Sequence, residues 1–544
     1  MMKRLIILLA AVLPALCSCN DWLDGVTQTS RVTDATVWQN ESSVDSYVNS
    51  FYVLLHDYGQ FGTAQFGGSL TESLTDTFKY GSVTLGNRAG HSNNYVTNPN
   101  AISPDGCLYS IWATGKAYGD IRKLNQFLAL QKTYSTFSEE KNVLWEAQVR
   151  FFRAFVYFQL ARRHGGVILY DTLPDASGRD RSSAEETWQF IADDLDFAAR
   201  NLPAAYDAAD KGRVTQGAAW ALKSRAMLYA ERWQDAYDAA EQVINSHRYG
   251  LVADYAEAWK GGNRESILEF AYDAVNGPNH DFDSHYVPLC DGWENGGRGT
   301  PTQEMVECYE TADGATVDWT PWHAGMTTVT PPYASLEPRF HATVIYRGCV
   351  WKGRTMDCSE DGDNGTYIPW REQATVYGKT VTGYFLRKLL DENHTDIKNV
   401  RSNQTWVEIR YAEVLLNKAE AAWHLPGHFA DAQEALDQVR SRVSLPPKDL
   451  VGDEWFKAYR NERKVELAYE GHLFWDMRRW KLAHTDYNGY RVHGFKINGL
   501  SNSYTYVDCD GTDRWFDSKL YVLPVPSEEL KNNPSGIRQY DEWL

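Results

Sequence analysis

The 544-residue sequence lacks several features that mark common classes of protein. It has eight cysteines but no two separated by two residues, which argues against a structural zinc site. Basic side chains number 54 against 72 acidic ones, so the net charge is −18 and phosphate backbones are repelled. No apolar run reaches the roughly 20 residues that a membrane-spanning helix needs. We therefore expect neither a nucleic-acid-binding protein nor a transmembrane one.

Familiar catalytic motifs are also missing. HExxH and GxSxG are absent, and Gly378-Lys379-Thr380 lacks the upstream glycine of a phosphate loop because Gln373 stands in its place. A glycoside hydrolase needs only two suitably placed carboxylates, which 72 acidic residues always permit in principle. We predict no catalytic residues, and hydrolysis stays open as an alternative.

Residues 1–18 have the pattern of a signal peptide. Lys3 and Arg4 precede an apolar run, and small Ser18 stands immediately before Cys19. The segment from Leu16 to Cys19 resembles a bacterial lipobox, in which the cysteine becomes acylated. Acyl chains contribute about 0.8 kcal/mol per buried methylene, so several of them would hold the protein on a membrane. We predict lipidation at Cys19; a plain secretory signal cut nearby is the alternative.

Helical periodicity occurs in paired segments. Residues 141–164 carry an apolar stripe that stops at Gly165-Gly166, and residues 109–130 and 454–482 are further helices. Two antiparallel hairpins of tetratricopeptide type are predicted over 214–246 and 405–442, with small Ala219, Ala226, Ala236 and Ala239 where backbones approach. A single hairpin cannot bury its apolar face alone, so stacked hairpins are expected.

Residues 60–107 and about 255–385 have a different composition. They are rich in Gly, Asn, Asp, Thr and Pro, with weak helical periodicity, yet too aromatic to be disordered. Short strands are predicted at 343–346 and 380–386. We predict a mainly α fold for a single body, 19–544, with a helical scaffold over about 22–58, 108–254 and 400–482 and a loop-rich region over 60–107 and 255–385.

Seven segments in order along the chain resemble the SusD/RagB family of Bacteroidetes lipoproteins. They are CNDWLD at 19–24, RAFVYFQLARRHGGVIL at 153–169, GRVTQGAAWALKSRAMLYAERWQDAYDAAEQVINSHRYGL at 212–251, TPTQEMVECY at 300–309, EIRYAEVLLNKAEA at 408–421, ERKVELAYEG with WDMRRW between 462 and 480, and VLPVP at 522–526 followed by Asn533-Pro534.

That resemblance implies a location, a partner and an activity. Members of the family are anchored by lipid at the outer membrane, exposed on the cell surface, and cover a TonB-dependent SusC-like transporter. They capture oligosaccharides, or peptides in RagB-like members, and pass them on without cutting them. The resemblance also implies a mainly helical fold with tetratricopeptide-like hairpins.

Charged residues within the family segments suggest a structural role. Charges recur on helices that should be packed, and a network of ion pairs between helices explains this better than catalysis. The residues concerned are Arg410, Glu413, Glu420, Arg463, Glu466 and Glu470.

The loop-rich segments hold the candidate binding residues. Aromatic rings can stack on the apolar faces of sugars, while Asp, Asn and Arg can bond the hydroxyls. With 20 Trp and 32 Tyr in the chain, packing between loop and scaffold is an equal alternative for any one ring. The predicted ligand-binding set is Asp76, Tyr80, Tyr95, Trp293, Trp319, Trp322, Trp351, Arg354, Trp370 and Tyr377. The many tryptophans favour a glycan over a peptide.

Two acidic turns offer oxygen ligands of the kind that calcium prefers. One contains Asp361, Asp363 and Asn364, and the other Asp508, Asp510 and Asp513. Neither completes an EF-hand, so no cofactor or metal is predicted and a structural calcium ion stays open. Cys349 and Cys358 are close enough in sequence to close a loop disulfide, with free buried thiols as the equal alternative.

Overall fold

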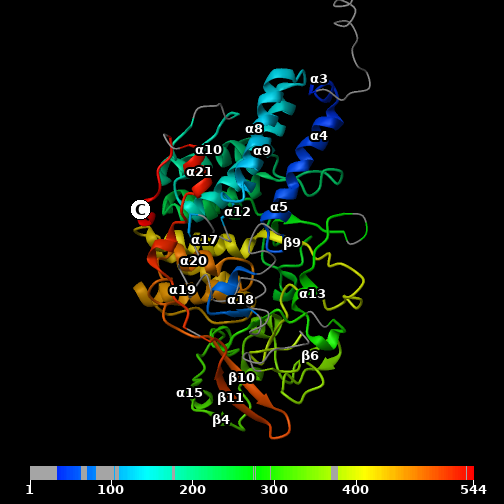
Figure 1. The fold of residues 1–544 in the computed structure, drawn as a ribbon, viewed down its shortest axis with the longest axis vertical. Coiled ribbons are helices and arrows are strands. Elements are labelled where there is room, and N and C mark those ends of the chain that lie inside the picture. Colours follow the sequence, from blue (N-terminus) through cyan, green and yellow to red (C-terminus); the bar gives the residue numbers. More distant parts are fainter. Residues whose placement is uncertain are drawn as a thin grey trace, which may run out of the picture.

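The computed structural model describes residues 34–62, 70–80, 103–104, 110–173, 178–273, 275, 277–293, 296–368, 378–511, 513–533 and 536–544. The predicted signal peptide and Cys19 lie outside these residues, as do the predicted binding residues Tyr95, Trp370 and Tyr377. Helices occupy one end of the molecule and short strands with long loops occupy the other (Figure 1). The predicted mainly α fold is confirmed.

The scaffold consists of helices that pack mostly on their neighbours in the chain, with α12 packing on the distant α17. Contacts join α9 to α10, α10 to α11, α11 to α12, α12 to α17 and α17 to α18. The scaffold helices are α3 (Asp34–Val37), α4 (Glu41–Asn49), α5 (Val53–Tyr58), α8 (Lys116–Tyr134), α9 (Glu139–His164), α10 (Ala184–Asn201), α11 (Gln216–Tyr229), α12 (Trp233–Asn245), α17 (Tyr411–His424), α18 (Phe429–Arg442), α19 (Gly452–Glu466) and α20 (Leu473–Arg479). The paired arrangement agrees with the predicted hairpins.

Local sequence explains where these helices begin and end. The hydroxyl of Ser183 and the carboxylate of Glu186 form a capping box at the start of α10. α9 ends at Gly165, whose φ of 68° is readily adopted only by glycine. The predicted small residues of the first hairpin are all buried: Ala219, Ala226, Ala236 and Ala239. They allow α11 and α12 to approach closely.

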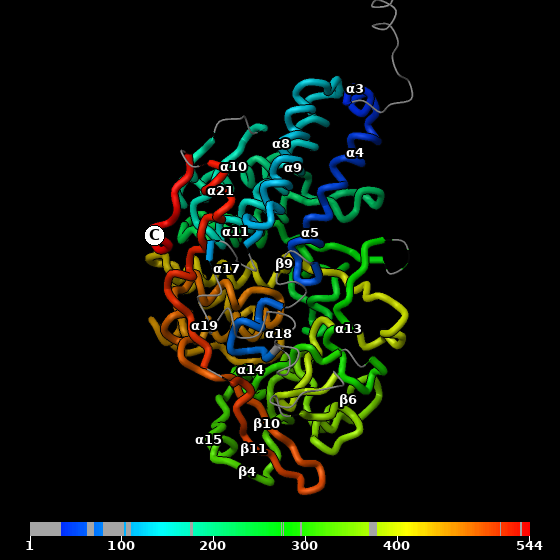
Figure 2. Tube along the Cα trace, in the orientation of Figure 1, coloured from blue at the N-terminus to red at the C-terminus, as the bar shows by residue number. Residues whose placement is uncertain are grey.

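Figure 2 shows how the chain ends are arranged on the scaffold. α4 and α5 run alongside α8 and α9, and the C-terminal residues lie beside α10 and α21 (Ser527–Asn532). The hydroxyl of Tyr540 donates a hydrogen bond to the carbonyl of Gly166, 2.5 Å away. The last residues are therefore attached to the helical end of the molecule.

The loop-rich end contains short strands and single-turn helices. Its strands form small antiparallel sheets in the orders β1-β3, β10-β11-β4, β5-β8 and β6-β7. Their bounds are β1 (Phe78–Tyr80), β3 (Gly299–Pro301), β4 (Met326–Thr327), β5 (Val344–Ile345), β6 (Val350–Trp351), β7 (Arg354–Thr355), β8 (Phe385–Leu386), β10 (His493–Asn498) and β11 (Ser503–Asp508), and the short helices are α13 (Phe282–Tyr286), α14 (Gln303–Val306), α15 (Thr320–His323) and α16 (Pro338–Thr343). β5 and β8 lie within the two segments predicted to be strands.

One segment differs from the prediction. The helical hairpin expected over 405–442 begins as a strand, β9 (Trp406–Arg410), which pairs with β2 (Ser266–Phe270). Its sequence, WVEIR, is rich in β-branched and aromatic residues, and all five of its residues are buried. The helix α17 starts only at Tyr411.

Each end of the molecule has its own hydrophobic core. One cluster includes Trp38, Phe155, Leu222 and Leu415 within the scaffold. The other includes Tyr286, Phe340, Trp351 and Phe385 within the loop-rich end. The loops are thus a packed body carried by the helices.

A buried network of ion pairs joins the two ends, and we call it the ionic seam. Arg410 pairs with Glu265 at 2.7 Å, Glu466 at 2.6 Å and Glu470 at 2.7 Å. From the loop-rich end, Arg339 reaches Glu466 at 3.2 Å. Further buried pairs connect Arg225 with Glu413, Arg463 with Asp476 and Arg479 with Glu420. The predicted structural role of the charged family segments is confirmed.

Two further expectations can be compared with the described residues. None of their helices combines the length and apolarity needed to cross a bilayer. Cys349 and Cys358 are free thiols, and both are buried.

Candidate functional site

Three of the predicted binding residues lie around the short helix η5 (Leu289–Asp291). The indole Nε1 of Trp351 donates to Asp291 Oδ2 at 3.0 Å, and Arg354 pairs with the same carboxylate. Trp293 follows two residues after η5 and is half-buried against the loop-rich core. The structure therefore brings Trp293, Trp351 and Arg354 together.

Segments flanking other predicted residues meet at the same place. The amide of Gly378 donates to the carbonyl of Gly296, and its carbonyl accepts from the amide of Leu289, both at 2.7 Å. The backbone of Tyr80 pairs with Gly299 in the β1–β3 ladder. Nothing is described of the Tyr80 side chain or of residues 369–377. The binding roles predicted for Tyr80, Trp370 and Tyr377 stay predictions.

The expectation of exposed rings is wrong for two residues. Trp351 has no exposed surface, and Trp319 is only 5% exposed. Trp351 packs in the loop-rich core. Its indole donates a hydrogen bond to Asp291, and the guanidinium carbon of Arg387 lies 5.8 Å from its ring centroid. Trp319 packs edge to face with Trp322, their centroids 5.6 Å apart. Both rings contribute to packing, which was the alternative reading.

Trp322 and Asp76 lie apart from the η5 cluster. Trp322 belongs to α15, is half-buried, and donates from Nε1 to the carbonyl of Val329 at 2.9 Å. Asp76 forms an ion pair with Lys464 of α19 at 2.7 Å. The carboxylate of Asp76 is therefore already used in holding the loop-rich end to the scaffold.

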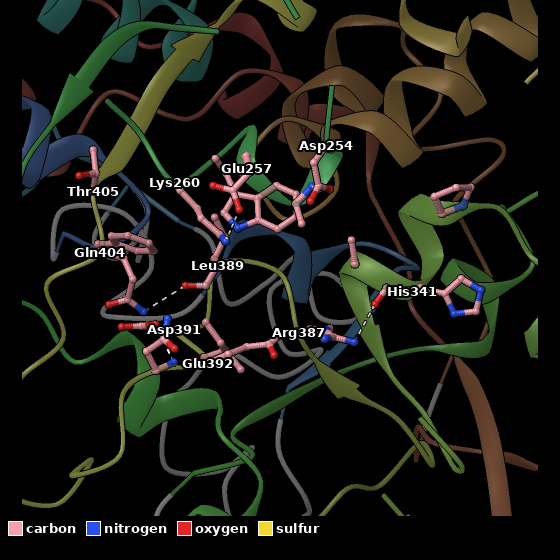
Figure 3. A pocket seen from close by; sticks show the side chains of 17 residues that line it. Asp254, Glu257, Lys260, His341, Arg387, Leu389, Asp391, Glu392, Gln404 and Thr405 are labelled. Atoms are coloured by element: carbon pink, nitrogen blue, oxygen red, sulfur yellow. Dashed lines mark hydrogen bonds and ion pairs between the residues drawn. The ribbon is translucent and has the colours of Figure 1, made fainter. Parts of the chain in front are cut away.

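A pocket of about 660 Å³ has Arg387 in its wall, and the guanidinium of Arg387 lies 5.8 Å from the Trp351 ring centroid. We call it the junction pocket because its lining comes from both sides of the boundary between scaffold and loops (Figure 3). The lining residues are Phe61, Asp254, Ala256, Glu257, Trp259, Lys260, Pro338, His341, Ala342, Arg387, Leu389, Leu390, Asp391, Glu392, Asn393, Gln404 and Thr405. Its volume falls in the usual range for small-ligand sites.

Aromatic and aliphatic side chains form the apolar part of the junction pocket. Trp259 follows the short helix η4 (Tyr255–Glu257), is 8% exposed and packs edge to face on Tyr255 at 5.0 Å. Behind it, Lys388 Nζ lies 4.9 Å from the Trp259 ring centroid. Burial lowers the pKa of Lys388 to about 8, although Glu470 acts in the opposite direction.

Charged groups occupy the rim. Lys260 Nζ lies 2.6 Å from Glu257 Oε1, and Arg387 Nε donates to Glu392 Oε1 at 2.8 Å. His341 makes contacts through both ring nitrogens, and burial lowers its pKa, so it is neutral at neutral pH. The pocket thus offers apolar walls together with donors and acceptors suited to hydroxyl groups.

The buried carboxylate of Asp283 organises the loop that forms one wall of the pocket. It accepts hydrogen bonds from the amide of Asp391 at 3.1 Å, from His394 at 2.7 Å, from the Ser402 hydroxyl at 3.0 Å and from the Gln404 amide group at 2.6 Å. Asp283 itself has no exposed surface. Four bonds from one loop to one carboxylate hold the pocket wall in a defined position.

None of the predicted binding residues within the described ranges lines the junction pocket. Arg387, Asp391 and Glu392 lie just beyond the predicted end of the loop-rich region at 385, and Gln404 lies within the segment predicted as helical scaffold. The run DENH at 391–394, after the buried Leu389 and Leu390, was a usable signal, since charged residues crowded after a short strand often form a loop at a site.

In the two acidic turns for which calcium stays open, several of the carboxylates have protein partners. Asp510 is buried beside Lys79 and Arg514, Asp508 and Asp513 both pair with Arg491, and Asp361 accepts from backbone amides at 499 and 500. Within the described ranges, no three His, Cys, Asp or Glu side chains gather as a metal site would require.

Comparisons with known proteins agree along almost the whole chain. Residues 264–543 match the model of the SusD family, and residues 21–228 match a model described as starch-binding associating with outer membrane. A SusD-like protein of Bacteroides ovatus is 23% identical over 579 residues, covering 98% of this chain and 96% of the relative.

Solved structures share the fold. A SusD-like protein from Bacteroides fragilis has a TM-score of 0.79 at 27% identity, covering 94% of this chain and 98% of that one. A SusD-like carbohydrate-binding protein from the same species has a TM-score of 0.76 at 22% identity, with 92% and 99% covered.

Proposed function

Because the chain belongs to the SusD family, we propose that it is a surface glycan-binding lipoprotein that captures oligosaccharides and delivers them to a TonB-dependent SusC-like transporter of the outer membrane. The observation that carries the proposal is the junction pocket, which combines apolar walls with a rim of hydrogen-bonding groups. A sugar ring presents the complementary surfaces, apolar C–H faces edged by hydroxyls. The similar carbohydrate-binding protein from B. fragilis supports the same ligand class.

In the proposed mechanism the protein binds the glycan and releases it without catalysing a reaction. Ring contacts and hydroxyl hydrogen bonds hold the glycan with micromolar or weaker affinity, since a ligand held more tightly would be released slowly to the transporter. The chain breaks no bond. Hydrolysis would instead show product formation that disappears when a pair of carboxylates is replaced, and peptide capture would show binding of mixed peptides but of no glycan.

The Arg387→Met variant is expected to bind glycan at least about tenfold more weakly than the wild type, because hydrogen bonds from a charged donor contribute about 1.5–3 kcal/mol each. Calorimetry of the chain beginning after Cys19, against a panel of plant, microbial and host oligosaccharides and a peptide mixture, measures this. Arg200→Met, at an exposed residue of α10, is the matched control and should bind normally. Equal affinity of both variants would remove the junction pocket from the proposal.

A second prediction concerns the anchor. In a bacterial host of the same phylum, the Cys19→Ser protein should leave the outer-membrane fraction, because the acylated residue is gone and no described helix crosses the membrane. Fractionation followed by immunoblotting gives the measurement. Cys17→Ser changes a neighbouring cysteine and should stay with the membrane. Membrane retention of the Cys19→Ser protein would contradict the predicted lipidation.

A further inference from the structure

The junction pocket carries an excess of negative charge. Among the described residues, its lining contains four carboxylates, Asp254, Glu257, Asp391 and Glu392, and two cationic side chains, Lys260 and Arg387. The remaining titratable residue, His341, lies with Nε2 3.2 Å from the carbonyl of Leu336 and Nδ1 2.9 Å from the hydroxyl of Tyr346, an arrangement that suits the neutral ring. The lining therefore has a net charge of −2.

Both cations are already neutralised within the pocket. Lys260 pairs with Glu257 at 2.6 Å, and Arg387 pairs with Glu392 at 2.7 Å. A ligand carboxylate or sulfate would have to compete with these carboxylates for its positive partner. Arg387 is the one guanidinium among the described lining residues, and Glu392 already occupies part of the bidentate fork with which a guanidinium commonly binds an anion.

Two of the carboxylates have no cationic partner among the described residues. Asp254 accepts from the amide of Ala256 at 2.9 Å, and Asp391 Oδ1 accepts from the amide of Asn393 at 2.8 Å. Neither forms an ion pair with any basic side chain of the described ranges. Their remaining acceptor capacity suits a donor such as a hydroxyl group.

The carboxylates lie on opposite sides of the pocket. Figure 3 shows Asp254 and Glu257 on one side and Asp391 and Glu392 on the other, with Arg387 beside the second pair. A sugar placed between them meets acceptor groups on both sides. An uncharged sugar can donate hydroxyl hydrogens to both, whereas a uronate or sulfate group brings another acceptor and a like charge.

From this charge distribution we infer that the junction pocket selects uncharged glycans and excludes those that carry carboxylate or sulfate groups. The inference rests on the proposed function and adds the ligand class to it. The net charge of −18 over the chain acts in the same direction at longer range.

The test compares neutral with acidic ligands in the wild type and in a charge-removal variant. Neutral gluco-, xylo-, manno- and galacto-oligosaccharides are titrated beside oligogalacturonate, oligoalginate and a sulfated galactan of similar length. In the double variant Asp254→Asn with Asp391→Asn, an amide oxygen can still accept from the amides of Ala256 and Asn393, so the backbone hydrogen bonds are kept while two charges are removed. The control, Asp238→Asn with Asp396→Asn, removes two exposed charges that do not line the pocket.

The wild type is expected to bind a neutral glycan at least about tenfold more tightly than any acidic one. The ratio of the affinity for the neutral glycan to that for the acidic glycan should fall severalfold in the pocket variant and stay unchanged in the control. Raising the salt from about 0.05 M to about 0.5 M should also lower it, since screening weakens repulsion between exposed charges.

The outcomes separate the inference from the proposed function. An acidic glycan that binds as tightly as a neutral one overturns the charge selection and leaves glycan capture standing. A ratio that is the same in the pocket variant as in the wild type overturns the assignment to Asp254 and Asp391. A panel in which no glycan binds but peptides do overturns the proposed function itself.

Discussion

The Arg410→Met variant is expected to lose about 3–5 kcal/mol of the free energy of unfolding, the cost of breaking a buried ion pair by removing one partner. The guanidinium donates to the carboxylates of Glu265, Glu466 and Glu470 and also to the backbone carbonyl of Glu466. The variant leaves these carboxylates buried with fewer partners. Denaturant unfolding followed by circular dichroism measures the change.

Two comparisons show whether the loss comes from the buried network. Lys141→Met removes an exposed ion pair with Glu41 and should change stability by less than about 1 kcal/mol. Arg410→Lys keeps the charge but not the planar fork, and should be intermediate. If Arg410→Met were as stable as Lys141→Met, the ionic seam would not stabilise the junction of the two ends.

Acidification should destabilise the protein through His164. This side chain is fully buried, with Nδ1 3.1 Å from the carbonyl of Leu523 and Nε2 3.3 Å from the hydroxyl of Ser110, and burial lowers its pKa to about 3. Between pH 6.5 and 3 the unfolded chain binds a proton there and the folded chain does not. The contribution of His164 to the free energy of unfolding is therefore fully present above pH 6.5 and is lost as the pH falls towards 3. The loss is at most roughly 4–5 kcal/mol.

The experiment compares pH profiles of stability, because other groups contribute to the profile of the wild type. Burial raises the pKa of Glu72 to about 7, so that group stabilises the protein at low pH and its contribution declines as the pH rises from 4.5 to 7. His164→Gln cannot titrate and should lose less stability than the wild type between pH 7 and 4. His247→Asn, at an exposed position, should follow the wild type. Identical slopes for all three would show that His164 does not titrate as proposed.

Helices were predictable because their signals are local. The stripe over 141–164 and the stop at Gly165 agree with α9, and the small residues at 219, 226, 236 and 239 are buried between helices as expected. β9 was missed because the apolar positions of WVEIR continue into the periodicity of α17, and pairing with β2, more than 130 residues earlier, is not a local property.

The candidate site was less predictable, since exposure of a side chain depends on tertiary packing. Trp351 and Trp319 have the composition of a sugar platform but are buried, and Trp351 has partners as far away in sequence as Asp291 and Arg387. The junction pocket joins Phe61, η4, α16 and two loops near 390 and 404, and no sequence window contains them together. Composition marked out the loop-rich segments but could not indicate which of their side chains line a pocket.

The hydrogen bonds of Asp283 bear on which residues of the pocket wall can be substituted. One carboxylate fastens the loop at residues 391, 394, 402 and 404. The intervening stretch from 395 to 401 is mostly exposed and makes none of these four hydrogen bonds. Apart from the buried Ile397, substitutions in this stretch should cost little stability. The surface next to the junction pocket can therefore change in sequence while Asp283 keeps the wall itself in place.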